Sequence, residues 1–219
     1  MNAKMQPIIY IHVEDPSMKV TLDELLRKFP GLSMENIEII DHGSKSHLMK
    51  NLPKRLDGYA HVDRSVIRVL VLVDRDDSDC RELKNQLEEM AARYNLPTKS
   101  KPGADGHFLV VNRIVIEELE AWFFGDIDAL RAAFPRIQDT LGKEAAYRHP
   151  DTIAGGTWEA LHKVLSRAGY YKQGLPKIEV AQKIACHMEP SRNRSPSFQA
   201  FWLGLQALTN APDNNHDRI

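Results

Sequence analysis

The sequence predicts an α/β fold: an open, mostly parallel sheet of about four strands flanked by helices, followed by a C-terminal helical extension. Three observations support this. Four short β-branched runs occur in the first 134 residues, helical patterns separate them, and no strong strand pattern follows. Strands that alternate with helices are typical of a parallel sheet with right-handed crossovers. We therefore expect two parts: residues 1–134 as the α/β domain and residues 135–219 as a helical extension packed on it.

The first strand is expected at residues 7–13 (PIIYIHV), which are rich in β-branched and aromatic side chains. Residues 18–29 then carry apolar side chains at helical spacing. Asp15 or Ser17 is the expected N-cap, because both residue types accept hydrogen bonds from the free N–H groups of a first helical turn.

The second strand is expected at residues 37–40 (IEII) and is short. A helix at 45–56 follows, with three leucines on one stripe, and Pro53 is expected to kink or break it. Residues 66–73 (VIRVLVLV) form the strongest strand pattern in the chain. An almost continuously apolar strand is typical of the centre of a parallel sheet that is covered on both faces.

The remaining elements are mostly helical. A helix is expected at 80–94, a fourth strand at 108–111 (FLVV) and a helical region at 114–134. Further helices are expected in the C-terminal part, at 158–168, 178–188 and 197–208. Residues 210–219 are polar and are expected to fray.

Composition limits the class of protein. The chain has 219 residues, 42% of them hydrophobic, and a formal net charge of −1. No apolar run reaches the roughly 20 residues of a membrane helix, and Cys80 and Cys186 are too far apart for a metal-binding pair. We therefore expect a cytoplasmic protein with free thiols. Because the net charge offers no overall attraction for nucleic acid, such binding would need local basic patches, metal ions or a partner.

Acidic residues follow two of the predicted strands. Glu14 comes after the first strand, and Asp74 and Asp76 come after the third. The carboxyl ends of parallel strands meet at one edge of a sheet, so these side chains can converge on Mg²⁺ or Mn²⁺. Acidic residues in such loops also cap helices, and the sequence leaves both interpretations open. For Asp77 and Asp79, just before a helix, capping is favoured.

Glu120 is a further acidic candidate. At helical spacing, Ile116, Leu119, Phe123 and Leu130 define an inward stripe, and Glu120 lies at its edge. A carboxylate beside a core stripe is either a buried hydrogen-bonding group or a site residue. The pattern does not decide between them.

Two local basic segments are candidates for phosphate contact. Lys45 opens a helix after the second strand, where backbone N–H groups also favour an anion. Arg192 and Arg194 form a second basic segment near the C-terminus. The alternatives are a solvated helix face for Lys45 and a helix start capped by Ser195 or Ser197 for the arginines.

A strand that ends in Glu14, followed about 60 residues later by a strand that ends in Asp74-Arg75-Asp76, resembles the Toprim catalytic pattern. Toprim domains occur in topoisomerases, primases, recombination proteins and nucleases of the overcoming-lysogenization-defect type. Longer segments resemble the domain-of-unknown-function family numbered 4276, which is grouped with Toprim-like proteins. These segments are HVEDPSM, HGSKSHLMKNLPKRLDGYAH, LVLVDRDDSDC, VVNRIVIEELEAWFFGDIDALRAAFP, AGGTWEAL and RNRSPSFQAF.

The resemblance implies a metal-dependent nuclease, with Glu14 as acid/base or metal ligand and with Asp74 and Asp76 as Mg²⁺ ligands. The Glu-Ala-Trp segment of the family falls on Glu120, which makes it a fourth acidic candidate. The implied substrate is nucleic acid, DNA in preference to RNA. The implied setting is anti-phage or mobile-element defence beside a partner ATPase of the ABC or structural-maintenance type.

The sequence departs from the Toprim pattern at one position. Toprim proteins usually place Gly after the first Glu, whereas Asp15 and Pro16 follow Glu14 here. Proline fixes its own φ and restricts the residue before it, so we expect a different turn. Two other functions stay open at this level: a subunit that acts with an ATPase and has no catalysis of its own, and a metal-dependent phosphoryl hydrolase for small substrates.

Overall fold

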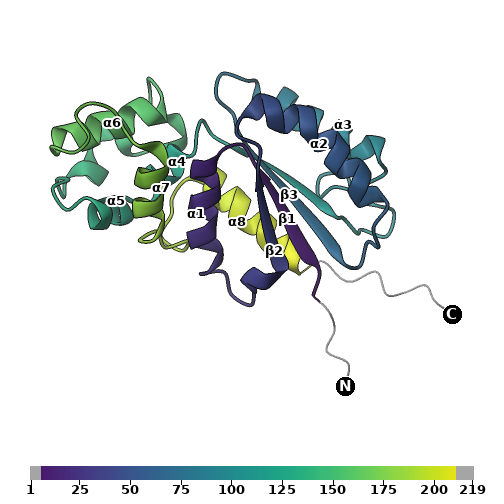
Figure 1. The fold of residues 1–219 in the computed structure, drawn as a ribbon. Coiled ribbons are helices and arrows are strands. Elements are labelled where there is room, and N and C mark those ends of the chain that lie inside the picture. Colours follow the sequence, from purple (N-terminus) through teal and green to yellow (C-terminus); the bar gives the residue numbers. More distant parts are fainter. Residues whose placement is uncertain (1–5, 211–219) are drawn as a thin grey trace.

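The computed structural model describes residues 6–210 and contains one parallel four-stranded sheet with the order β2-β1-β3-β4 (Figure 1). The predicted fold class is therefore confirmed. The strands are β1 (Ile8–Val13), β2 (Ile37–Asp41), β3 (Ile67–Asp74) and β4 (Val110–Val115).

Eight α-helices accompany the sheet in the described residues, with short 3₁₀ turns between some of them. They are α1 (Pro16–Leu26), α2 (Lys45–Ala60), α3 (Cys80–Arg93), α4 (Glu120–Gly125), α5 (Ile127–Ala133), α6 (Thr157–Arg167), α7 (Lys177–Ala185) and α8 (Pro196–Thr209). None of the helices in residues 6–210 is both long and apolar enough to cross a membrane. Cys80 and Cys186 are free thiols, as expected.

The sheet separates two apolar layers. Along β3, Val69, Val71 and Val73 face one side and pack with leucines of α2 and α3, whereas Leu70 and Leu72 face the other side. This alternation follows from the two-residue period of a strand. In Figure 1, α2 and α3 lie on one face of the sheet, and α1 and α8 cover the other. The central strand is buried along its whole length, as its apolar pattern predicted.

The C-terminal helices belong to the same apolar core as α1 and the sheet. α7 packs on α1, and α8 packs on β4. Helices α4 to α7 gather beyond the carboxyl edge of the strands, on the left of Figure 1. The boundary predicted at residue 134 stays a prediction, but the segment after it supplies part of the sheet's cover.

Helix starts follow the expected capping rules. Asp15 caps α1 by accepting from the Met18 N–H at 3.0 Å, and Pro16 takes the first helical position, where a missing N–H costs nothing. Asp79 caps α3 in the same way, as predicted. The predicted break at Pro53 is wrong: α2 continues through it, because buried leucines on both sides of the proline hold the helix against the sheet.

The fourth strand lies later than predicted. It occupies Val110–Val115 rather than 108–111, and the next helix begins at Glu120 rather than at Ile114. The structure extends the strand through the polar residues Asn112 and Arg113. In the structure, Asn112 stays in the strand because its side chain donates to a buried carboxylate of α3.

Candidate active site

Glu14 and Asp74 lie together at the carboxyl edge of the sheet. β1 and β3 are hydrogen-bonded neighbours, so the residues at their ends meet. The Glu14 Oε2 atom accepts from the Asp74 backbone N–H at 3.3 Å. Asp74 is only 4% exposed, and its Oδ1 atom has no hydrogen-bond partner in the described residues. The structure thus brings together two of the acids that the sequence predicted to meet.

Asp76 lies in the turn after β3 with a φ of 47°, a left-handed conformation that Asp tolerates better than most residues. Its side chain is 43% exposed and forms an ion pair with Lys45 at 3.1 Å. The Lys45 ammonium also donates to the backbone carbonyls of Asp74 and Arg75 and to the Ser78 hydroxyl. Lys45 therefore secures the turn that carries two of the predicted acids.

Glu120 opens α4 and is 1% exposed, and its Oε2 atom has no hydrogen-bond partner among residues 6–210. The charge of Glu120 is among the causes that raise the pKa of Asp74, and the charges of Lys177 and Asp15 act on both carboxylates, which places Glu120 in the same electrostatic environment. The other two glutamates of the segment point elsewhere. Glu117 pairs with Arg75 at 2.6 Å, and Glu118 caps α6 by accepting from Trp158 N–H at 3.0 Å. Glu120 is thus the glutamate of this segment that belongs with Glu14, Asp74 and Asp76. We call these four acids at the carboxyl edge of the sheet the acidic edge.

Burial and mutual repulsion raise the pKa values of these acids. Burial, with repulsion from Asp76, raises the pKa of Glu14 to about 7. Burial raises the pKa of Glu120 to about 7, even though the Lys177 ammonium opposes the shift. Burial and the charges of Glu14 and Glu120 raise the pKa of Asp74 well above its ordinary value. Charge on this cluster is therefore costly unless a cation is added.

Lys177 is a site residue that the sequence did not reveal. It is the first residue of α7, and its ammonium pairs with Asp15 at 2.9 Å. Burial works against its charge, but the carboxylates of Glu120, Asp15 and Asp74 raise the pKa of Lys177 above its ordinary value. A helix of the C-terminal segment thus places a permanent cation among acids of the sheet edge.

The described residues contain no group of three or more His, Cys, Asp or Glu side chains already arranged to hold a metal ion. Two lysines explain part of this. Lys45 holds the Asp76 carboxylate, and Lys177 holds Asp15 and approaches Glu120 and Asp74. The cluster is therefore acidic and only partly neutralised, with its unpartnered oxygens on Asp74 and Glu120.

The two arginines predicted for phosphate contact lie at the other end of α4 from Glu120. The Arg192 guanidinium pairs with buried Asp126 at 3.2 Å, and the Arg194 N–H donates to the Gly125 carbonyl. Both line a hollow of about 400 Å³. Ser195 caps α8, as the alternative interpretation had it.

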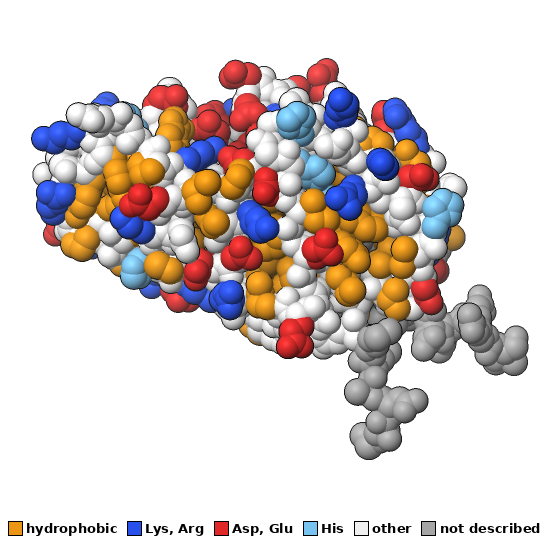
Figure 2. All heavy atoms as spheres, in the orientation of Figure 1, with side chains coloured by type: hydrophobic (Ala, Val, Ile, Leu, Met, Phe, Trp, Pro, Cys, Tyr) orange, Lys and Arg blue, Asp and Glu red, His pale blue; other side chains and the backbone are white. Residues whose placement is uncertain are grey.

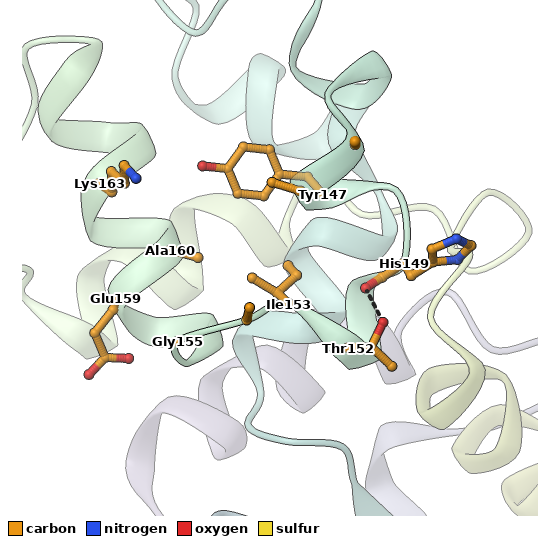
Figure 3. A pocket seen from close by; sticks show the side chains of 11 residues that line it. Tyr147, His149, Thr152, Ile153, Gly155, Glu159, Ala160 and Lys163 are labelled. Atoms are coloured by element: carbon orange, nitrogen blue, oxygen red, sulfur yellow. Dashed lines mark hydrogen bonds between the residues drawn. The ribbon is translucent and has the colours of Figure 1, made fainter.

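A different hollow of about 400 Å³ lies between α6 and the turns before it. Tyr147, His149, Glu159 and Lys163 are among its lining residues (Figure 3). No acid of the sheet edge contributes to it. It is not a candidate for the same chemistry.

The fold and the site define a parallel α/β domain with a buried carboxylate cluster at the carboxyl edge of its sheet. The chain belongs to the family described as a domain of unknown function (DUF4276), whose model matches residues 13–206. The predicted family membership is thereby confirmed.

Comparison with solved structures finds a likeness to the C-terminal region of the Burkholderia pseudomallei OLD protein. The two are 14% identical with a TM-score of 0.49, and the match covers 92% of this chain and 98% of that chain. No curated protein matches the sequence.

Proposed function

We propose that this protein is a divalent-cation-dependent nuclease that hydrolyses phosphodiester bonds of nucleic acid at the carboxyl edge of its sheet. One observation carries the proposal. Asp74 and Glu120 are almost fully buried, each with a carboxylate oxygen that no described residue satisfies, and Glu14 lies beside Asp74. Buried charges normally have partners, so such acids point to a cation that arrives from outside.

The side chains fit Mg²⁺ or Mn²⁺. Carboxylate oxygens are the ligands that these hard cations prefer, and the unpartnered oxygens of Asp74 and Glu120 are available for coordination. Glu14 and Asp76 would complete the ligand set. Burial is the main cause of the raised pKa values of Glu14 and Glu120, so a bound cation would stabilise the ionised carboxylates that burial disfavours.

The bound cation would polarise a phosphoryl oxygen and lower the pKa of a water molecule. Glu14 has a pKa of about 7 in the chain without a cation, and a cation beside it would keep it ionised at neutral pH. Its carboxylate would then help to hold the ion and accept a hydrogen bond from the attacking water. Lys177 stays charged and is positioned to neutralise a phosphate oxygen as negative charge develops on it. Lys45 keeps Asp76 and the turn after β3 in place.

We assign the arginine-lined hollow to the nucleic-acid backbone away from the cleaved bond. Its lining holds four cations, Arg131, Lys143, Arg192 and Arg194, and three acids, Asp126, Asp128 and Asp139. Because Arg192 is paired with Asp126, a phosphate would be held mainly by the other three cations. DNA as the substrate, a partner ATPase and a role in phage defence are proposed from the family resemblance.

Replacement of Asp76 tests the proposal, because this half-exposed side chain can be removed without opening the core. Asp76→Ala should abolish plasmid cleavage in Mn²⁺ and lower the melting temperature by only about 2–4 °C, because alanine tolerates the left-handed φ of 47° less well than Asp. Asp77→Ala is the matched control, since this neighbouring acid is exposed and should cut like the parent.

Equal cleavage by the parent and Asp76→Ala would refute the assignment. Cleavage of small phosphomonoesters without cleavage of DNA or RNA would replace the nuclease by a phosphoryl hydrolase. Cleavage that begins only when an ATPase is added would place the chain as the nuclease subunit of a larger assembly.

A further inference from the structure

A second surface of the protein is a groove of about 730 Å³ beside α2, on the sheet face that α2 and α3 cover. Strands β1 and β2 supply its floor, and α2 supplies one wall. The volume lies in the range of ligand-binding pockets. Its lining includes Tyr10, His42, Asn51, Lys54, Arg55 and Tyr59.

The wall of this groove is basic in a protein that is otherwise close to neutral. Lys54 and Arg55 of α2 line the groove against one acid, Asp41 of β2, whereas the whole chain has a formal charge of −1. Figure 2 shows Lys, Arg and His side chains gathered at the upper right, over α2. Lys54 and Arg55 are exposed, and neither forms an ion pair within residues 6–210. Their charge is therefore available to an anion.

Two packed aromatic rings line the groove, Tyr10 on its floor and Tyr59 on its α2 wall. The centroids of Tyr10 and Tyr59 are 4.8 Å apart. Buried His12 fixes this arrangement, because its ring nitrogens lie 3.0 Å from Tyr59 Oη and 3.0 Å from His42 Nε2. Burial is the main cause that lowers the pKa of His42, and the charge of nearby Arg55 is the second. The Arg55 cation and the rings of Tyr10 and Tyr59 therefore lie on one surface, and hydrogen bonds of His12 keep it in place.

The groove leads toward the acidic edge. Its lining extends from Ile67, level with Ile8 on β1, to Asp41, level with Val13. Five residues of strand correspond to about 16 Å. Glu14 follows Val13 directly. A chain lying along the groove would therefore leave it at the carboxyl edge of the sheet, where Glu14 lies.

We propose that this groove binds a single strand of nucleic acid, with phosphates on Lys54 and Arg55 and a base against Tyr10, and directs it to the acidic edge. Proteins that hold single strands combine a basic groove with aromatic rings on which bases stack. The claim that the groove directs the strand to a cleavage site rests on the proposed nuclease function. The claim that the groove binds a single strand does not depend on that function.

Charge reversal in the groove tests the phosphate contacts. The full chain is titrated with a fluorescently labelled oligothymidylate in EDTA, so that cleavage plays no part. The Lys54→Glu/Arg55→Glu variant should bind at least ten-fold more weakly than the parent. The slope of log affinity against log salt should fall by about 1.4, at about 0.7 per lost contact. Lys99→Glu/Lys101→Glu is the matched control: both lysines are exposed in the loop before β4, and parental affinity is expected.

Replacement of Tyr10 tests the base contact separately. Tyr10→Leu keeps an apolar side chain against Tyr59 and should weaken binding of the oligothymidylate about five- to 150-fold. An abasic oligonucleotide offers phosphates without bases. Its affinity should be unchanged by Tyr10→Leu and still reduced by Lys54→Glu/Arg55→Glu.

The outcomes separate the groove from the nuclease. Parental affinity in both groove variants would overturn the proposal that the groove binds nucleic acid, even if the protein cuts DNA. Reduced affinity in these variants with parental affinity in the lysine control would support the groove even if no cleavage is seen. Complete displacement of the oligonucleotide by an equal concentration of mononucleotide would overturn the proposal in favour of a small-ligand site.

Discussion

Two buried glutamates in this protein have opposite environments. Glu88 on α3 is 3% exposed and accepts hydrogen bonds from Thr98 and Asn112, with Lys84 at 2.7 Å. Burial opposes ionisation, but these partners lower its pKa below the ordinary value. Glu120 on α4 is 1% exposed, has an unpartnered oxygen and has its pKa raised to about 7.

The hydrogen-bond network of Glu88 is structural, whereas the acids around Glu120 form a site that can accept a cation. The partners of Glu88 come from α3, β4 and the loop between them, so the network holds α3 and this loop against β4. Its hydrogen bonds are complete without a bound ion or ligand. The acids around Glu120 are satisfied only in part, and they repel one another. Stable proteins rarely leave buried carboxylates in this state without a functional reason.

The largest expected effect is on cleavage. Asp74→Asn removes the charge of an almost fully buried acid of the edge while keeping its shape. Because a cation held there would supply several kcal/mol of charge stabilisation, cleavage should fall at least about a thousand-fold. A plasmid-nicking time course in Mn²⁺ measures the rate.

Glu88→Gln is the control for this loss. It also neutralises a buried carboxylate, but in the structural network. Cleavage per folded molecule should stay within about three-fold of the parent, since no contact with the acidic edge is lost. A loss as large as that of Asp74→Asn would show that the two networks are not distinct in function.

The next largest effect is on the free energy of unfolding, which Glu120→Gln should raise and Glu88→Gln should lower. The folded chain keeps a proton on Glu120 up to about pH 7, whereas the unfolded chain releases it near 4.5. Folding therefore binds a proton in this window, stability falls as the pH rises through it, and the full cost is present above pH 7. At pH 8 without metal, Glu120→Gln should stabilise the protein by about 3 kcal/mol.

Glu88→Gln should act in the other direction. It replaces a charged acceptor of three donors by a neutral group and should cost about 2 kcal/mol. Urea denaturation of both variants at pH 8 measures the two values. If Glu120→Gln destabilised the protein as much as Glu88→Gln, Glu120 would be a satisfied core residue and the site would lose its fourth acid.

Much of the acidic edge could be predicted because it depends on local patterns. Apolar runs marked β1 and β3, and a parallel sheet places the residues after such strands at one edge, so Glu14 and Asp74 were expected to meet. The departure at Asp15-Pro16 also has a local cause, because Asp15 caps α1 and Pro16 opens it.

Lys177 could not be found in the same way. It lies in a polar stretch more than 100 residues beyond Asp74, and only the packing of α7 on α1 brings it to the acids. The end of β4 was missed for a related reason, since Asn112 is stable in a strand only because Glu88 of α3 accepts its amide. Long-range partners decided both positions.

The smallest expected effect is thermal and depends on pH. Mn²⁺ at ten times its dissociation constant should stabilise the folded chain by about 1.4 kcal/mol, which is about 3–5 °C for a protein of this size. At pH 5.5, Glu14 and Glu120 hold protons because their pKa values are about 7, and the cation must displace them. The shift there should fall below about 1 °C.

Differential scanning fluorimetry at pH 8 and pH 5.5 measures this difference. Glu88→Gln should keep the full pH 8 shift, because its network is remote from the cation, whereas Asp74→Asn should lose it. A shift that is equal at both pH values, or that survives in Asp74→Asn, would mean that Mn²⁺ binds elsewhere. The unpartnered oxygens at the sheet edge would then require some other cation, and Lys177, already charged and already among these acids, would be the first candidate.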